Sequence, residues 1–243
     1  NSMNKADFNY IDHYKRDAEE FDYFEHRSGA TAHDERRVRE YIISGVDVKQ
    51  GRVLDVGAGS AWVAEKFTQK GFEVVSMDIS LKNLVKAKEK VPGSLHSCVS
   101  SDAFKLPYKD ASFDLVIASE VIEHVYDPKG FVKELTRVVK PGGQLLITTP
   151  YKEKLQYSLC IHCNKPTPLH AHIHSFDEKV LLSLFKDTHA SSLEWATFGN
   201  KLLIFLRTYV ILQFFPFPLW KLKDSAANLL FKKPVHILIK YTR

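Results

Sequence analysis

Apolar runs alternate with amphipathic segments along the middle of the chain, after a polar region over residues 4–50 that we expect to be helical. Five short apolar runs predict buried strands: 52–56, 73–78, 96–101, 113–119 and 144–149. Between them, apolar residues recur every three or four positions and predict three helices: 61–69, 80–90 and 128–139. This alternation indicates an α/β fold, a parallel sheet with helices on both faces.

Capping residues support the predicted helix starts. Ser80 and Asp127 are N-cap residue types, and Pro128 suits the first helical position. Farther along, Ser175 and Glu178 have the spacing of a capping box, which predicts a helix from there to about residue 187.

The last third of the chain follows a different pattern. A probable strand at 192–197 precedes an apolar and basic insertion at 198–232, and a closing strand is predicted at 235–241. The expected result is an open sheet that ends in a hairpin-like pair of strands. A length of 243 residues fits a single domain over 1–243. Ligands of such sheets bind beyond the carboxyl ends of the strands, so we expect the chemistry there.

A glycine-rich turn joins the first predicted strand to the first predicted helix. The turn reads Gly57-Ala58-Gly59, and glycine lets a ligand approach the backbone where a helix start offers unpaired N–H groups. The dinucleotide fingerprint requires a third glycine three residues after the second. Trp62 occupies that position, and its bulk would hold the helix away from the strand. The turn therefore indicates a nucleoside cofactor smaller than a dinucleotide.

Acidic residues lie at the ends of successive predicted strands. Asp55 precedes Gly57 by two residues, and Asp78 follows it by 21, where a carboxylate accepts both hydroxyls of a ribose. Asp102 ends the third strand and could accept an exocyclic amine, and Glu120 follows the fourth. One such acid alone is usually a helix cap or a solvated loop residue. Several of them after a glycine-rich turn favour a nucleoside site.

These segments together resemble the class I S-adenosylmethionine-dependent methyltransferases, particularly the small-molecule branch similar to ubiquinone-biosynthesis methyltransferases. The resemblance rests on five segments: VLDVGAGSAW (53–62), MDIS (77–80), SDAFKLPY (101–108), SFDLVIASEVIEHVYDP (112–128) and VVKPGGQLLITTP (138–150). It implies a Rossmann-like, seven-stranded, mostly parallel sheet with a C-terminal antiparallel strand, and a cofactor-binding core over 51–150. It also implies the S-adenosylmethionine contacts: the methionine end near Asp55, Gly57, Ala58 and Gly59, ribose on Asp78, adenine against Ile79, Asp102, Ala103 and Phe104, and a floor of Ser119 and Glu120 beneath the sulfonium.

A first candidate metal cluster is Glu120-x-x-Glu123-His124. If this stretch is helical, the three side chains share one face, and two carboxylates with an imidazole suit Mg²⁺ or Mn²⁺. The block resembles that of catechol-type quinone O-methyltransferases and small-RNA 2′-O-methyltransferases, which use a divalent ion to hold acceptor hydroxyls. The alternative is that these residues only shape the cofactor pocket.

A second candidate metal cluster lies in residues 150–175, which we interpret as a Cys/His insertion. Its spacing is typical of a zinc site, with four candidate ligands: Cys160, Cys163, His170 and His172. In the alternative, the cysteines are reduced thiols, and His172 and His174 line the acceptor pocket.

The net charge of +5 is concentrated near the C-terminus. Residues 201–243 hold eight Lys or Arg against one acid, whereas the first 200 residues hold 26 basic and 28 acidic side chains. The apolar stretch 202–220 is nearly long enough to span a bilayer, but Arg207, Gln213 and two prolines argue against it. We expect an ordinary cap over the domain with a basic rim. An interfacial or lid segment at anionic lipid headgroups is the alternative.

The leading hypothesis is a methyltransferase that transfers a methyl group from S-adenosylmethionine to a hydroxyl, or to a carbon or amine, of an apolar or lipid-linked small molecule. His124 and His172 are the candidate catalytic residues, one of them as a base. N-terminal aromatic residues form a wall of the acceptor site or simply dock on the sheet: Phe8, Tyr10, Tyr14, Phe21, Tyr23 and Phe24.

Two other functions stay open at this point. RNA 2′-O-methylation is motivated by Glu120, Glu123 and His124, but the basic residues coincide with apolar ones, so nucleic acid is not the expected partner. A non-catalytic zinc-binding or membrane-surface module is the third hypothesis. Three cysteines and a charged N-terminal region predict a cytoplasmic protein, with peripheral membrane contact as a variant. The sequence carries no indication of an oligomeric state.

Overall fold

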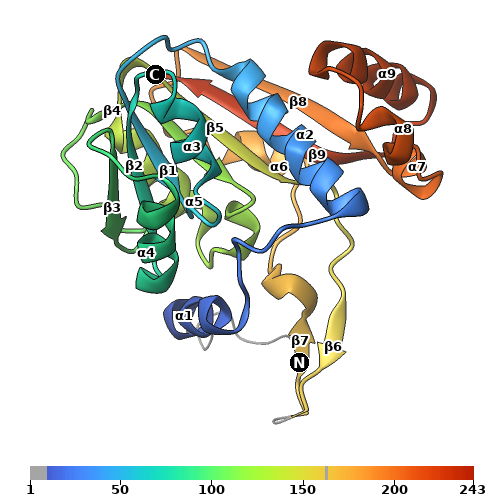
Figure 1. Ribbon diagram of the computed structural model, residues 1–243, viewed down its shortest axis with the longest axis horizontal. Helices are drawn as coiled ribbons and strands as arrows, with labels where there is room; N and C mark the ends of the chain where they lie inside the picture. The colour runs from blue at the N-terminus through green and yellow to red at the C-terminus, as the bar shows by residue number, and fades with distance from the viewer. Residues whose placement is uncertain (1–9, 162–163) are drawn as a thin grey trace.

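A seven-stranded sheet organises the computed structural model, which describes residues 10–161 and 164–243 (Figure 1). The strands lie in the order β3 (His96–Ser100), β2 (Glu73–Asp78), β1 (Arg52–Val56), β4 (Phe113–Ser119), β5 (Val139–Pro150), β9 (Pro234–Thr242) and β8 (Ser192–Asn200). The first five are mutually parallel, and β9 is antiparallel to both β5 and β8. The predicted Rossmann-like sheet with a C-terminal antiparallel strand is confirmed.

Helices cover both faces of this sheet (Figure 1). They are α1 (Tyr10–Glu20), α2 (Gly29–Gly45), α3 (Trp62–Thr68), α4 (Leu81–Lys90), α5 (Pro128–Val138), α6 (Glu178–Ser183), α7 (Lys201–Phe205), α8 (Tyr209–Leu212) and α9 (Phe217–Leu230). Successive strand residues point to opposite faces. Leu54 of β1 therefore packs with Phe131 of α5 in one core cluster, and its neighbour Val53 packs with Ile42 of α2 in the other. The two layers hold the sheet, and with it the strand ends, in a fixed position.

Helix starts follow the local capping signals at two of the three predicted places. The Ser80 hydroxyl accepts from the Asn83 N–H at the start of α4, and the Asp127 carboxylate accepts from the Gly130 N–H at the start of α5. The predicted capping box at Ser175 is wrong. There the chain stays extended, because the buried Phe176 forms a β-bridge with Tyr151.

Asp177 is the actual N-cap of α6, which ends at Ser183 instead of about residue 187. Two strands are longer than predicted. β5 begins at Val139, because a bulge lets Val139 pair with Phe113 before the regular register starts at Gln144. β8 continues to Asn200, which removes the first residues of the predicted insertion 198–232.

The segment after β5 contains a small two-stranded hairpin, β6 (Tyr157–Leu159) and β7 (Pro166–Pro168), and a 3₁₀ turn at Leu169–Ala171. Cys163 of the predicted zinc cluster and Phe8 of the aromatic group lie outside the described residues. In the part of the chain that the structure describes, no helix has both the length and the apolar character needed to cross a membrane.

Candidate functional site

The turn after β1 has the close backbone approach that its glycines predict. Gly57 has a φ of +73°, and a Cβ added to it would lie 2.7 Å from a methyl group of Val121. The N–H groups of Gly57 and Ala58 both donate to the Met77 carbonyl of β2, at 2.9 and 3.0 Å. A side chain at position 57 would therefore be strained in conformation and would clash as well. The turn is tied to the neighbouring strand and borders a cavity on its open side.

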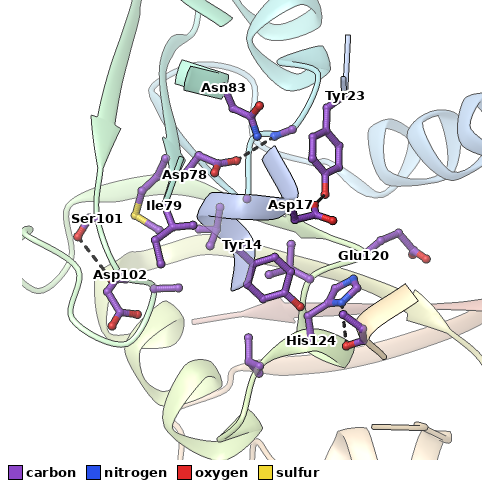
Figure 2. A pocket seen from close by; sticks show the side chains of 18 of the residues that line it. Tyr14, Asp17, Tyr23, Asp78, Ile79, Asn83, Ser101, Asp102, Glu120 and His124 are labelled. Atoms are coloured by element: carbon purple, nitrogen blue, oxygen red, sulfur yellow. Dashed lines mark hydrogen bonds between the residues drawn. The ribbon is translucent and has the colours of Figure 1, made fainter. Parts of the chain in front are cut away.

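This cavity has a volume of about 230 Å³ and lies at the carboxyl ends of the strands (Figure 2). Predicted site residues that line it are Gly57, Gly59, Asp78, Ile79, Asp102, Ala103, Phe104, Glu120, His124 and His170. Asp55, Ala58, Ser119 and His172 are not among the lining residues. The position agrees with the rule that ligands of open α/β sheets bind beyond the strand ends.

Part of the cavity wall comes from the N-terminal segment. Tyr14 and Asp17 of α1, and Tyr23 after it, line the cavity opposite the glycine turn (Figure 2). Tyr14 packs edge-on against His124, with ring centroids 5.7 Å apart. The aromatic spacing of this segment indicated Tyr14 and Tyr23, whereas nothing in the sequence pointed to Asp17.

The acids at the ends of β2 and β3 are held by backbone N–H groups. Asp78 accepts from the N–H of Ser80 at 2.9 Å and, more weakly, from that of Gly59 at 3.4 Å. Burial raises the pKa of Asp78, and these hydrogen bonds oppose the rise. Asp102 accepts from the N–H of Phe104, whose ring packs against Tyr126. Both carboxylates therefore present a fixed edge to the cavity.

Asp55 lies beneath the turn and is fully buried in β1. Burial raises the pKa of its carboxyl group to about 8, with a smaller contribution from Asp78. Its Oδ2 atom has no hydrogen-bond partner. A buried polar atom without a partner is costly, so a donor or a cation delivered by a ligand would stabilise this position.

Glu120 follows β4 in the left-handed conformation, with a φ of +53°. Its Oε2 lies 3.4 Å from Nδ1 of the buried His236 on β9, and Nε2 of His236 lies 2.9 Å from an Asp34 oxygen on α2. Burial alone would lower the pKa of His236, but Glu120 and Asp34 outweigh it and raise the pKa to about 10. A buried imidazolium therefore links the cavity wall to α2. The sequence gave no signal for this residue's role.

His124 lies beside two other metal-binding residue types. Among the described residues, Glu123, His124 and His172 place one ligand atom each within 4.8 Å of one another. Nδ1 of His124 lies 3.3 Å from the Ala171 carbonyl, and Nδ1 of His172 lies 2.5 Å from a Glu153 oxygen. Each imidazole thus has a partner on one nitrogen and keeps the other for a ligand.

Charge and burial around this group are unusual. Burial lowers the pKa of His124 to about 3, and His172 lowers it further. Burial and the nearby Glu120 raise the pKa of Glu123 well above its ordinary value. Glu123 accepts from the Thr149 hydroxyl with one oxygen, and its other oxygen, Oε1, has no partner and lies 3.9 Å from Nε2 of His124.

The predicted magnesium set is corrected by this geometry. The chain is a 3₁₀ turn only over Ile122–His124, and Glu120 lies before it in a left-handed conformation. Glu120, Glu123 and His124 therefore do not share a helical face, and the observed group contains His172 in place of Glu120. The same group contains neither Cys160 nor His170, so within the described residues the predicted zinc ligands are not brought together. With Cys163 outside that range, a zinc site stays a prediction.

Comparison with known proteins agrees with the cavity and its strand-end acids. Residues 54–147 match the methyltransferase domain family. The chain carries a methyltransferase domain. This domain is 38% identical over 113 residues to a demethylmenaquinone methyltransferase of Renibacterium salmoninarum, a match covering 46% of this chain and 47% of that protein. It is 31% identical over 128 residues to a ubiquinone biosynthesis O-methyltransferase of Xanthomonas oryzae, covering 50% and 52%. The chain therefore spans about half the length of these relatives.

Solved structures share the fold around the methyltransferase domain. A S-adenosylmethionine-dependent methyltransferase of Mesorhizobium loti has a TM-score of 0.60 at 17% identity, over 87% of this chain and 100% of that one. The phosphoethanolamine N-methyltransferase 2 of Haemonchus contortus, in complex with S-adenosyl-L-methionine, has a TM-score of 0.59 at 18% identity, over 86% and 52%. At this identity the likeness shows the fold alone.

Proposed function

We propose that the protein transfers a methyl group from S-adenosylmethionine to a hydroxyl, or to a carbon or amine, of an apolar or lipid-linked small molecule. The observation that carries the proposal is the meeting of the Gly57–Gly59 turn and the Asp78 carboxylate in one cavity at the strand ends. The quinone-pathway names of the relatives support an acceptor of low polarity.

The residues of the cavity fit the parts of the cofactor. The Asp78 carboxylate would accept from ribose hydroxyls, and Asp102 with Phe104 would hold the adenine. The unpartnered Oδ2 of Asp55 lies in the strand that leads into the turn, where the amino-acid end is proposed to bind. A cationic amine there would supply the partner that this buried carboxyl group lacks.

The chemistry requires mostly orientation. When bound, S-adenosylmethionine supplies a methyl group on a cationic sulfur, which departs as a neutral thioether. Holding an acceptor in line with such a group can contribute roughly 7–11 kcal/mol to lowering the barrier. Tyr14 and Val121 form apolar parts of the wall that exclude water, and Glu120 presents a carboxylate to the cavity.

Two histidines serve different roles in this proposal. With a pKa of about 3, His124 is neutral at physiological pH and is a weak base, so it suits binding better than proton removal. His172 lies against the Glu153 carboxylate, an arrangement that orients an imidazole and stabilises its protonated form. We assign His172 as the base for an acceptor hydroxyl and His124 as its hydrogen-bond partner.

A divalent cation is the further part of this proposal. The fit test is favourable, because the orphaned Oε1 of Glu123 is buried beside two imidazoles whose other nitrogens already have partners. Two imidazoles and a carboxylate suit Mn²⁺ or Zn²⁺ better than Mg²⁺. Such an ion would lower the pKa of an acceptor hydroxyl. Calorimetric titration of chelator-treated protein with Mn²⁺ and Zn²⁺ tests it, and equal affinity in His124→Gln and the unaltered protein would exclude these ligands.

Calorimetry with S-adenosylhomocysteine tests the cofactor site. Asp78→Asn keeps an oxygen for the Ser80 N–H but replaces the second acceptor by an amide NH₂. We expect a Kd roughly 10- to 100-fold higher, since one hydrogen bond to a charged group contributes about 1.5–3 kcal/mol. The control Asp187→Asn removes an exposed acid far from the cavity lining and should leave the Kd unchanged.

No binding by the folded, unaltered protein would overturn the proposal and favour a non-catalytic zinc-binding or membrane-surface module on this fold. Salt-sensitive binding of small RNA, together with transfer to its 2′-hydroxyl, would instead favour RNA methylation.

A further inference from the structure

Helices α7, α8 and α9 gather at one end of the molecule, beside β8 and β9 (Figure 1). Eleven large apolar side chains between residues 204 and 231 are exposed there. Phe205 and Phe214 are 80% exposed and Leu229 is 78% exposed. We call these eleven side chains the apolar face of α7–α9. Single exposed apolar residues are ordinary on proteins, whereas a gathered set marks an interaction surface.

A few contacts fix this segment firmly to the rest of the protein. Leu212 and Trp220 are buried, and the buried Arg37 of α2 donates to the carbonyl oxygens of Leu212 and Phe215. The Arg37 guanidinium also lies 4.9 Å from the centre of the Trp220 ring. The segment is therefore anchored through a small inner surface, and its outer apolar side chains are not needed for that anchoring.

The orientation of α9 is the reverse of the usual one. Leu219, Leu222, Leu229 and Leu230 have helical spacing that places them on one side of the helix, and all four are exposed. A surface helix ordinarily turns such an apolar stripe toward the core. In α9 the inward residues are Trp220 and Asp224, and Asp224 accepts from the Gly199 N–H.

The charge around the apolar face has one sign. Six cations lie between residues 201 and 233: Lys201, Arg207, Lys221, Lys223, Lys232 and Lys233. The only acid in that stretch is Asp224, which is buried. Within residues 10–161 and 164–243, none of these six cations forms an ion pair with a carboxylate. The surface thus offers uncompensated positive charge next to exposed Leu and Phe.

We propose that the apolar face of α7–α9 docks on the surface of a membrane that contains anionic lipids. Apolar side chains would enter the boundary between headgroups and acyl chains, while the lysines and Arg207 pair with lipid phosphates. A second copy of the chain fits less well, because it would bring two sets of unpaired cations together around the contact. The inference goes beyond the proposed function, since it rests on this surface alone and needs no catalysis.

Co-sedimentation of the full chain with vesicles tests this proposal. We compare vesicles of phosphatidylcholine alone with vesicles that also contain phosphatidylglycerol, and expect binding mainly to the second kind. Raising the salt from 0.1 to 1 M shortens the Debye length from about 10 to about 3 Å and should weaken it. Replacing Lys232 and Lys233 by Gln should also weaken it, whereas the same change at the exposed Lys70 and Lys109 should not.

Two closely matched double variants test the apolar part. Val210→Ser/Leu222→Ser changes side chains that are 52% and 66% exposed on α8 and α9. Leu81→Ser/Val85→Ser changes the same residue types at 67% and 51% exposure on α4. The first should lower the partition coefficient at least about tenfold, and the second should leave it unchanged.

Equal binding by both double variants, or no preference for anionic vesicles, would overturn the proposal. Sedimentation velocity covers the other occupant: a dimer that dissociates in Val210→Ser/Leu222→Ser but not in Leu81→Ser/Val85→Ser would assign the surface to a second copy instead. Cofactor binding by the same variants is a separate measurement, so failure here is distinguishable from failure of the proposed function.

Discussion

At the scale of single residues, the cavity is surrounded by groups whose charge state is set by burial. Asp55 and Glu123 hold their protons more tightly than free carboxyl groups, His124 is kept neutral, and His236 is kept charged. Such displaced pKa values gather at functional sites, where a group is positioned for a ligand instead of for water. The acids were predictable from their places after the strands. His236 was not, because its partners Asp34 and Glu120 are far from it in sequence.

His236 makes a test at this scale through the pH dependence of stability. Its pKa is about 10 in the folded state against an ordinary 6.5, so its contribution is complete below pH 6.5 and is lost as the pH rises to 10. We expect His236→Gln to lower the free energy of unfolding by about 2 kcal/mol at pH 6, a value reduced because Asp34 and Glu120 are partly exposed.

Urea denaturation at pH 6, 8 and 10 measures that difference, which should shrink with rising pH. Glu123 and Asp224 also experience the charge of His236, so their titration contributes to the profile of both proteins. The control is His189→Gln, which changes an exposed histidine. A His236→Gln difference that is constant with pH would contradict the charged imidazolium.

At the scale of elements, α1 forms a wall of the cavity rather than a simple layer on the sheet. Lys82 of α4 donates to the Glu19 carbonyl, and Lys86 pairs with Asp22 at 2.8 Å, which places the N-terminal segment over the strand ends. The aromatic spacing predicted two outcomes for this segment, a wall or a dock. Only the contacts with α4 and His124 select the wall.

Tyr14→Ala tests the role of α1. Tyr14 lines the cavity and its ring contacts His124, so truncation should raise the Kd for S-adenosylhomocysteine about tenfold through lost apolar burial. Tyr14→Phe keeps the ring and should bind nearly as well as the unaltered protein. Tyr157→Ala, on the exposed β6 strand, is the control for loss of a tyrosine ring elsewhere. Unchanged calorimetric affinity in Tyr14→Ala would show that α1 does not contact the bound cofactor.

At the scale of the whole molecule, the end of the chain lies inside the sheet. β9 pairs with β5 on one side and β8 on the other, and it carries His236 to the cavity wall. Fold formation therefore depends on contacts between residues that are more than 80 positions apart, such as Leu146 and Lys240. The cofactor half and the C-terminal third are joined in one sheet.

Equilibrium unfolding tests this unity. Trp62, Trp195 and Trp220 lie in α3, β8 and α9, so tryptophan fluorescence reports on both parts. We expect its midpoint to coincide with that of far-UV circular dichroism. S-adenosylhomocysteine at about 100 times its Kd should raise the common Tm by roughly 5–10 °C. Two separated transitions, with only one shifted by the ligand, would show that α7–α9 unfold independently.

The sequence by itself determined the parts whose signals are local. Strands were readable from apolar runs, two helix starts from Ser80 and Asp127, and the cofactor turn from Gly57, because each depends on neighbouring residues and on backbone conformation. The start of α6 was missed, since a β-bridge from Tyr151 overrides the local capping signal.

Only the tertiary structure decided which side chains meet and which face water. It placed His172 with Glu123, joined Glu120 to His236, and turned the leucines of α9 outward. These outcomes follow from packing between elements distant in the chain. Periodicity shows that a helix has an apolar side, but the neighbouring elements determine whether that side is buried.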